Sequence, residues 1–224
     1  MIKNATVSRQ GNAWWTAPCE WPGKTAFVVG GGPSVLSQPI ELLRGRNVIV
    51  INSSYETIPF ADYLVTFDPK WWTEHKKKLL EFKGRIVAPS KVQLFCRLRH
   101  FMKRVDPPGL AAAPDSLAMM KTTFTAGINL AAHLVGSGGR IVLLGADGQK
   151  DKDGRSHHHP PHSWWTFNSR RWGLHHEEMA SLVAPLRDRG IDVVNASPGS
   201  AWADLWPVMS LAQAIELTTA RRAA

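Results

Sequence analysis

A short apolar run that ends in three glycines constrains the fold of this chain more than any other feature. Residues 25–34 read Thr-Ala-Phe-Val-Val-Gly-Gly-Gly-Pro-Ser, and an apolar-periodic segment follows from Val35 to Leu43. A run rich in β-branched residues is typical of a buried strand, and Pro33 suits the first position of a helix. The pattern therefore predicts a strand, a tight turn with a bare backbone, and a helix.

The same turn is a candidate anion site. A helix N-terminus presents unpaired N–H groups and the positive end of a dipole, and both favour a phosphate. The turn lacks the Lys-Ser/Thr pair of a P-loop and the third glycine of a dinucleotide fingerprint. Two interpretations stay open: an ordinary tight turn without a ligand, or a phosphate-bearing ligand held by Gly30, Gly31, Gly32, Pro33 and Ser34.

Strand and helix patterns alternate along the rest of the chain. The expected strands are short apolar runs at residues 25–29, 48–52, 63–67, 85–88, 141–145 and 192–195. The expected helices lie at residues 35–43, 71–82, 92–104, 126–135, 176–189 and 209–220. This alternation predicts an α/β fold with a single doubly wound, Rossmann-like, mostly parallel sheet and helices on both faces. The domain would span residues 25–224, after an N-terminal extension at residues 1–24.

Two stretches interrupt the alternation. Residues 106–116 are rich in Pro and Ala and predict a loop, while residues 147–175 are long, polar and rich in His and Trp. Loops of this length in compact domains are usually functional. We expect residues 147–175 to form a lid that is mobile without a ligand and closes over one. Adjacent tryptophans such as Trp71 and Trp72 are expected to place one indole of each pair at a rim.

Polar side chains follow several expected strands. Asn52 and Ser53 come after the second strand, Asp68 after the third, and Asp147 after the strand at residues 141–145. Open α/β sheets bind ligands at the carboxyl ends of their strands, so these side chains are expected at one ligand edge. Capping of the following helix or loop is the alternative role for each of them.

Two later segments add candidate groups. Thr125 is expected to cap a helix, and Ala126 and Gly127 behind it leave a second possible anion site. His175 is expected at a helix start near the ligand edge, where a lowered pKa suits a general base; a surface pair with His176 is the alternative. The histidines at residues 157–162 could bind a transition-metal ion, because clustered imidazoles are common metal ligands. Their spacing matches none of the common zinc-site patterns, so no metal ligand is assigned.

Composition bears on the binding partners and the cellular location of the protein. The net charge of +9 and pI near 9.9 predict an anionic partner, or else simply solvated helix faces. Cys19 and Cys96 are too few for a disulfide framework. No apolar run is long enough to span a bilayer, and residues 1–10 lack the apolar core of a signal peptide. We expect a cytoplasmic protein.

Taken in order, these motifs resemble those of the bacterial CMP-sugar-dependent sialyltransferases and of related phage and prophage proteins. Residues 28–34 are similar to the first strand and G-x-G-P-S turn of that family. Residues 52–55 look like its Asn-containing second turn, and Asp68-Pro69 sits where the family carries Asn-Pro. Residues 123–127 resemble its Thr/Ser-Gly helix start, and residues 141–147 resemble its strand ending in Gly-x-Asp. His175 lies near the position of its catalytic base.

The resemblance implies a metal-independent glycosyltransferase whose donor is a nucleotide-sugar and which needs no other cofactor. The acceptor would be a hydroxyl of a glycan, or of a modified nucleic acid, and the protein would be a homo-oligomer. His175 would act as the base, with His162 or His176 as alternatives, and Asp147 as a second catalytic residue. The implied nucleotide contacts are Gly30, Gly31, Gly32, Pro33, Ser34, Asn52, Ser53, Asp68, Thr125, Ala126 and Gly127.

The chain also departs from the pattern of that family. Asp68 replaces an asparagine, and the tyrosines that steady the donor phosphate are unmatched. Their place would fall to lid residues, with Arg155, His157 and His162 as the expected contacts and Gln149 and Lys150 as further candidates.

Two other functions stay open. The archaeal 6-hydroxymethylpterin pyrophosphokinases also use a G-x-G-P-S-like turn, which implies a nucleotide-dependent phosphotransferase that relies on metal-binding acids. The third alternative is a non-catalytic nucleotide- or DNA-associated binding protein that works through its basic surface.

Overall fold

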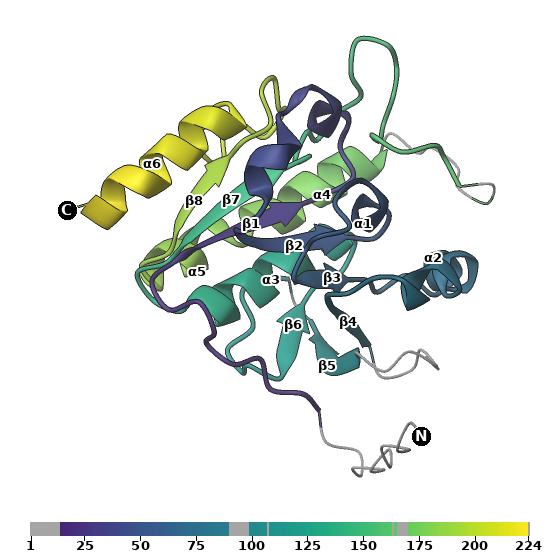
Figure 1. Cartoon of the computed structure of the whole chain (residues 1–224), viewed down its shortest axis with the longest axis horizontal. Helices are drawn as coiled ribbons and strands as arrows, with labels where there is room; N and C mark the ends of the chain where they lie inside the picture. The colour runs from purple at the N-terminus through teal and green to yellow at the C-terminus, as the bar shows by residue number, and fades with distance from the viewer. Residues whose placement is uncertain (1–13, 90–98, 107, 163, 165–169, 224) are drawn as a thin grey trace, which may run out of the picture.

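One parallel sheet organises the molecule (Figure 1). The computed structural model describes residues 14–89, 99–106, 108–162, 164 and 170–223. In these residues eight strands pair in the order β6-β5-β4-β3-β2-β1-β7-β8, and every pairing is parallel. The strands are β1 (Thr25–Val29), β2 (Asn47–Ile51), β3 (Tyr63–Val65), β4 (Arg85–Pro89), β5 (Arg99–Val105), β6 (Ser116–Ala118), β7 (Arg140–Leu144) and β8 (Asp192–Asn195).

Helices lie between the strands in sequence. The α-helices are α1 (Ser54–Thr57), α2 (Pro69–His75), α3 (Thr123–Val135), α4 (Arg170–Ala180), α5 (Val183–Asp188) and α6 (Leu211–Ala223). The 3-10 helices are η1 (Pro33–Ser37), η2 (Ile40–Leu43) and η3 (Lys78–Leu80).

Both faces of the sheet are buried. Successive side chains of a strand point to opposite faces, so Val28 joins one core cluster and Val29 joins the other. Residues of α3, α4 and α5 belong to the first cluster, and residues of α1, α2 and α6 belong to the second (Figure 1). The expected α/β class with a parallel sheet is confirmed.

The strand order creates a switch point beside β1. From β1 the chain moves outward strand by strand to β6, and then returns to place β7 on the other side of β1. Val29 and Leu144 are paired at the carboxyl ends of these two central strands. Chain connections leave in opposite directions there, which opens a crevice at the edge where α/β proteins bind ligands.

Several expected elements are wrong. Arg99–Val105 is strand β5 and not the end of a helix; residues 92–98 lie outside the described residues. The loop expected at residues 106–116 is present up to Asp115 among the described residues, but strand β6, which begins at Ser116, was not expected. The single helix expected at residues 35–43 is two short 3-10 helices, and the helix expected at residues 176–189 is divided between α4 and α5. Pairing with distant segments formed β5 and β6, whereas Pro39 stands at the break between η1 and η2.

The tryptophans are more deeply packed than expected. Trp71 and Trp72 are both buried, so the expectation of one rim indole is wrong for this pair, because both side chains of the helical α2 reach the second core cluster. In the N-terminal extension, Trp15 donates its backbone N–H to Phe101 and Trp21 donates to Leu134. The described part of the extension therefore packs onto the same domain.

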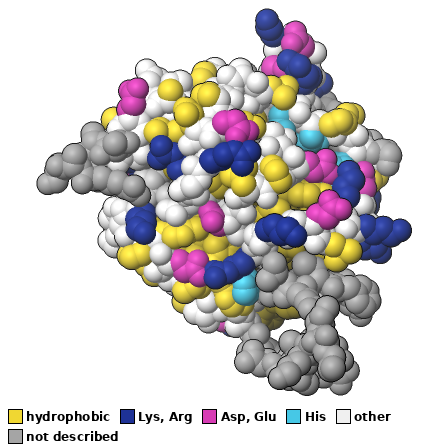
Figure 2. All heavy atoms as spheres, in the orientation of Figure 1, with side chains coloured by type: hydrophobic (Ala, Val, Ile, Leu, Met, Phe, Trp, Pro, Cys, Tyr) yellow, Lys and Arg dark blue, Asp and Glu magenta, His cyan; other side chains and the backbone are white. Residues whose placement is uncertain are grey.

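Charged side chains of both signs are interspersed on the face shown in Figure 2. Arg140 pairs with Asp192 at 3.2 Å, and Lys103 pairs with Asp115 at 2.6 Å. This mixing fits solvated faces better than a continuous basic surface on the side in view. Among the helices of the described residues, none has the length and apolar character that crossing a membrane requires.

Candidate functional site

A pocket of about 240 Å³ opens at the carboxyl edge of the sheet, above the switch point between β1 and β7. Its floor includes the turns after both strands, at Gly30 and Gly145. Its walls come from the turn after β2, the N-terminus of α3, the segment after β7, and α4. The sheet topology alone places a ligand site at this edge.

The glycine turn is packed against the neighbouring turn of the protein itself. A Cβ added to Gly32 would lie 1.9 Å from Oδ2 of Asp147 and 2.4 Å from the carbonyl oxygen of Gly145. A Cβ on Gly30 would lie 3.2 Å from the same carbonyl oxygen. Gly30 and Gly32 are thus required because the β1 and β7 turns approach each other closely, with or without a ligand.

Asp147 occupies the start of η1. Its Oδ1 accepts a hydrogen bond from the backbone N–H of Ser34 at 3.1 Å, and its Oδ2 accepts one from the Ser34 hydroxyl at 2.9 Å. Burial raises the pKa of Asp147, while the two bonds from Ser34 oppose that change. The expected position of Pro33 at the start of a helix is confirmed, but a carboxylate of the protein lies where a ligand phosphate was expected to bind.

The N-terminus of α3 faces the pocket through residues other than those expected. The N-cap is Thr122, whose hydroxyl accepts from the N–H of Phe124 at 3.2 Å, so the expected capping role of Thr125 is wrong. Thr122, Thr123 and Phe124 line the pocket. Ala126 is fully buried. A Cβ on Gly127 would lie 2.4 Å from Cδ1 of Ile51, so Gly127 serves helix–sheet packing.

A buried glutamate fixes this helix start. Glu178 of α4 accepts hydrogen bonds from the backbone N–H of Met120 at 2.7 Å, from that of Lys121, and from the Thr125 hydroxyl at 2.6 Å. These bonds tie the segment before α3 to α4, and both elements border the pocket. Thr125 therefore supports the site from within the core.

Helix α4 contributes a cluster that the sequence indicated only in part. Arg171, Trp172 and His175 all line the pocket. Burial lowers the pKa of His175, with Arg171 acting in the same direction and Glu178 opposing it. His175 lies well inside α4 and not at its start, and His176 pairs with Asp204 at 2.8 Å. The sequence motifs did not single out Arg171 as a site residue; its spacing of one helical turn from His175 was the available signal.

The turn after β2 presents a strained residue to the pocket. Asn52 has φ of +47°, a left-handed conformation that non-glycine residues seldom adopt. Its Oδ1 is buried and has no hydrogen-bond partner among the described residues. Strain and an unsatisfied buried acceptor are both typical of binding sites.

Its neighbours after β2 and β3 have structural partners. The Ser53 hydroxyl accepts from Nε1 of Trp71 at 2.8 Å. Asp68 caps α2 by accepting from the N–H groups of Lys70 and Trp71, although it also lines the pocket. The alternative capping role of Asp68 is confirmed.

The segment after β7 folds back over the glycine turn. The N–H of His158 donates to the carbonyl of Gly31 at 2.9 Å, and its ring contacts the hydroxyls of Ser54 at 3.0 Å and Thr57 at 3.3 Å. Burial lowers the pKa of both His157 and His158 to about 4. The part of the expected lid around His157 and His158 is thus held against the body of the domain, whereas residues 152–155 are exposed.

The lid residues divide between pocket and solvent. His157, His159 and His162 line the pocket. Arg155 points away from it, since its guanidinium pairs with Asp151 and Asp153, both at 2.7 Å. The structure brings His157 and His162 to the expected site and leaves Arg155 on the surface.

Comparison of the chain with protein-family models, with curated proteins and with solved structures finds no match.

Proposed function

We propose that this chain is a transferase that binds a nucleotide-activated sugar of the CMP-sugar type and transfers the sugar to a hydroxyl acceptor. The observation that carries the proposal is the convergence of the α3 N-terminus, Arg171 and His175 on one pocket. The α3 N-terminus and Arg171 can bind a phosphate, and His175 can accept a proton.

The donor phosphate belongs at the start of α3 in this proposal. With its thirteen residues, α3 carries the positive end of a full helix dipole into the pocket at Thr122 and Thr123. Arg171 adds a fixed positive charge with up to two parallel N–H donors. The glycine turn forms the floor beneath the donor, because Asp147 already accepts the N–H of Ser34.

The nucleoside end is assigned to the turn after β2. The Oδ1 atom of Asn52 can accept a hydrogen bond from a ribose hydroxyl or from an amino group of the base. Trp172 and Trp202 also line the pocket, and indole faces can stack on a base or on the apolar face of a sugar. Either contact would bury part of the nucleotide that the phosphate site does not reach.

His175 is the general base of the proposed reaction. Its lowered pKa keeps the imidazole neutral near pH 7, ready to accept a proton. As the acceptor oxygen forms its bond to the anomeric carbon, the bond from that carbon to the phosphate oxygen breaks. The acceptor proton passes to His175, and the departing nucleotide keeps the electron pair. Arg171 and the α3 dipole stabilise the charge that grows on the phosphate.

The segment at residues 147–162 serves as the lid. The hydrogen bonds of His158 to the glycine turn and to α1 support this role. They hold the segment over one side of the pocket. A covered pocket excludes water that would otherwise hydrolyse the donor.

Calorimetric titration with CMP, UDP, GDP and ATP, each with and without Mg²⁺, tests the donor class. CMP is expected to bind without the metal. Arg171 is exposed, so Arg171→Ala should fold normally and lower the affinity about 10- to 100-fold, the equivalent of one charged hydrogen bond. Arg170→Ala, next to it on α4, is the matched control and should change little. The proposal fails if no nucleotide binds, or if both variants bind like the wild type.

One observation favours the phosphotransferase alternative. Asp68 and Asp147 line the same pocket, and carboxylates are the ligands that Mg²⁺ prefers. Both are already acceptors for backbone N–H groups, which makes them weaker candidates for metal ligands. Binding of ATP that requires Mg²⁺ would put this alternative first.

A further inference from the structure

We propose that Glu74, His75 and His162 form a binding site for a divalent first-row transition-metal ion. Glu74 and His75 lie in the last turn of α2, and His162 comes from the segment after β7. One donor atom from each of the three side chains lies within 4.8 Å of the other two. Two imidazoles and one carboxylate are the donor set of many zinc sites and of non-haem iron sites.

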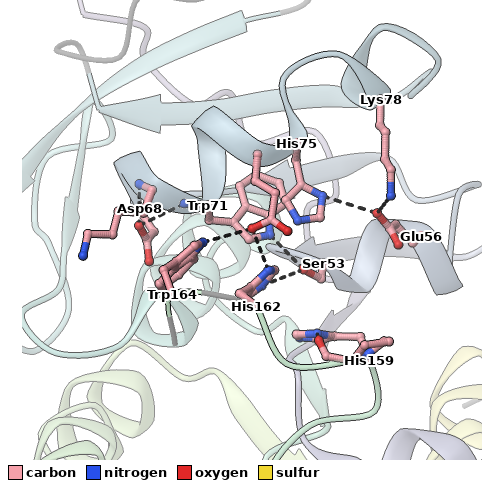
Figure 3. A network of polar contacts seen from close by, with 12 residues as sticks. Ser53, Glu56, Asp68, Trp71, His75, Lys78, His159, His162 and Trp164 are labelled. Atoms are coloured by element: carbon pink, nitrogen blue, oxygen red, sulfur yellow. Dashed lines mark hydrogen bonds and ion pairs between the residues drawn. The ribbon is translucent and has the colours of Figure 1, made fainter. Parts of the chain in front are cut away.

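His75 is oriented as a metal ligand. Its ring is buried, and its Nδ1 atom lies 3.1 Å from the Tyr55 hydroxyl and 3.3 Å from a carboxylate oxygen of Glu56 (Figure 3). Nζ of Lys78 contacts the same carboxylate oxygen at 3.0 Å. Metal-bound histidines commonly donate their second ring N–H to a carboxylate in this way, which leaves Nε2 with a lone pair for the metal.

The second ring nitrogen of His75, Nε2, is available to bind a metal ion. It is buried and has no hydrogen-bond partner among the described residues. An unsatisfied buried nitrogen of this kind costs about 1–3 kcal/mol. A metal ion bound to Nε2 would remove that cost.

His162 and Glu74 complete the donor set. Nδ1 of His162 lies 3.0 Å from Oε2 of Glu74, and the rings of His75 and His162 are nearly perpendicular, with centroids 5.4 Å apart. Figure 3 shows His162 below His75, with its ring directed into the same network. Donor atoms around a tetrahedral ion are separated by roughly 3.4 Å, so small rotations of these side chains would close the site.

The composition of the site selects the class of ion. Ca²⁺ and Mg²⁺ prefer shells of oxygen atoms, whereas two imidazole nitrogens favour zinc and its neighbours. Lys78 offsets the charge of Glu56, so Glu74 supplies the negative charge that compensates the ion. Because His162 also lines the pocket, a bound ion would fasten the segment after β7 to α2 at the pocket wall.

Zinc titration of the full-length, metal-free chain tests the site. One Zn²⁺ per chain is expected to bind. Glu74→Gln and His162→Asn should each weaken binding at least about 10- to 100-fold, more than the loss of a supporting hydrogen bond to a ligand. Neither variant changes the buried His75 ring itself, and the Glu74 side chain is 44% exposed, so Glu74→Gln in particular should preserve folding. Co²⁺ in place of Zn²⁺ should give the intense visible absorption of a four-coordinate ion.

Matched variants on α4 distinguish zinc binding at this site from nonspecific zinc binding by other histidines. Glu177→Gln and His176→Gln remove the same chemical groups from the helix surface and should leave zinc affinity unchanged. The proposal is overturned if the wild type binds no Zn²⁺. It is equally overturned if Glu74→Gln binds Zn²⁺ as tightly as the wild type, because the neighbouring histidines would then be the ligands. Neither result depends on nucleotide binding.

Discussion

Asp147 and Ser34, 113 residues apart in the sequence, are joined by two hydrogen bonds to the same carboxylate. The pair links the turn after β7 to the turn after β1 across the switch point of the sheet. A negatively charged side chain of the protein therefore takes the place next to the glycines that a ligand phosphate occupies in other folds. The close approach of the two turns explains why glycine is found there. Because Asp147 already occupies the start of η1, the proposed phosphate site is the N-terminus of α3.

Gly32→Ala is expected to destabilise the fold by about 1–3 kcal/mol or more, because the new methyl group would overlap the Asp147 carboxylate and the Gly145 carbonyl. Urea unfolding measures the change. A larger residue such as valine would disrupt the turn as well as alter any site there, so Gly32→Val is expected to lower stability as well as binding.

Gly31→Ala is the matched control for that change. Its Cβ would meet the His157 ring at 3.0 Å and Nε2 of His159 at 3.6 Å, and side chains can move where a backbone carbonyl cannot. It should cost clearly less than Gly32→Ala. Equal losses for the two variants would show that the approach of the two turns does not account for Gly32.

Asp147→Asn is expected to lower the free energy of unfolding by about 1–3 kcal/mol, because the amide nitrogen would face one of the two Ser34 donors. Asp153→Asn removes an exposed carboxylate that pairs with Arg155 and should cost less than about 0.5 kcal/mol. Chemical denaturation of both proteins gives the comparison. Similar values for both would contradict a stabilising role for the Asp147–Ser34 pair.

His175→Ala is expected to lower kcat by about 10²- to 10⁴-fold while the donor affinity stays close to that of the wild type. The reason is that a general base acts on the acceptor in the transition state and not on the bound donor. His176→Ala, which removes the surface partner of Asp204, should keep normal turnover. Normal turnover in the His175 variant would exclude the proposed base.

The stability of the protein should fall as the pH drops from about 6.5 to about 4. His100 stacks on Trp15 with ring centroids 4.1 Å apart, and burial lowers its pKa to about 4. Arg85 acts in the same direction, and Glu20 opposes it. The folded pKa lies below the unfolded value of about 6.5, so the unfolded chain binds the proton first as acid is added.

The contribution of His100 is therefore complete above pH 6.5 and is lost on acidification. It amounts to at most about 3 kcal/mol, and less where solvent screens the half-buried ring. Urea unfolding at pH 7.0 and 4.5 measures it, and the imidazole resonance of His100 should titrate near 4. His100→Gln should reduce the pH dependence; an unchanged dependence in that variant would contradict the assignment.

Local apolar pattern was enough to predict six strands of the sheet, β1 to β4, β7 and β8. The runs at β1 and β8 were expected with the bounds that the structure has, and β2, β3, β4 and β7 differ by one or two residues. These strands are continuous β-branched runs whose burial on both faces leaves no other suitable structure. Because parallel strands end at a common edge, the order of strands and helices also predicted where a pocket would form.

Strands β5 and β6 were not predictable in the same way. Residues 99–105 read Arg-His-Phe-Met-Lys-Arg-Val, a mixed pattern that fits a helix as well as a strand. Pairing with β4 and β6 makes this segment a strand. A helix forms through its own local hydrogen bonds, whereas a strand requires partners that lie elsewhere in the chain.

The sequence by itself determined the α/β class, the glycine turn and the edge of the sheet at which polar groups gather, since each depends on residues close together in the chain. Only the tertiary structure decided which of those groups meet. Asp147 reaches Ser34, His175 of α4 meets the N-terminus of α3 at the pocket, and Glu74 approaches His162. Such pairs depend on how helices pack on the sheet and where loops return. The number of residues between two such groups does not predict the distance between them in the folded protein. That distance depends on how the whole core packs.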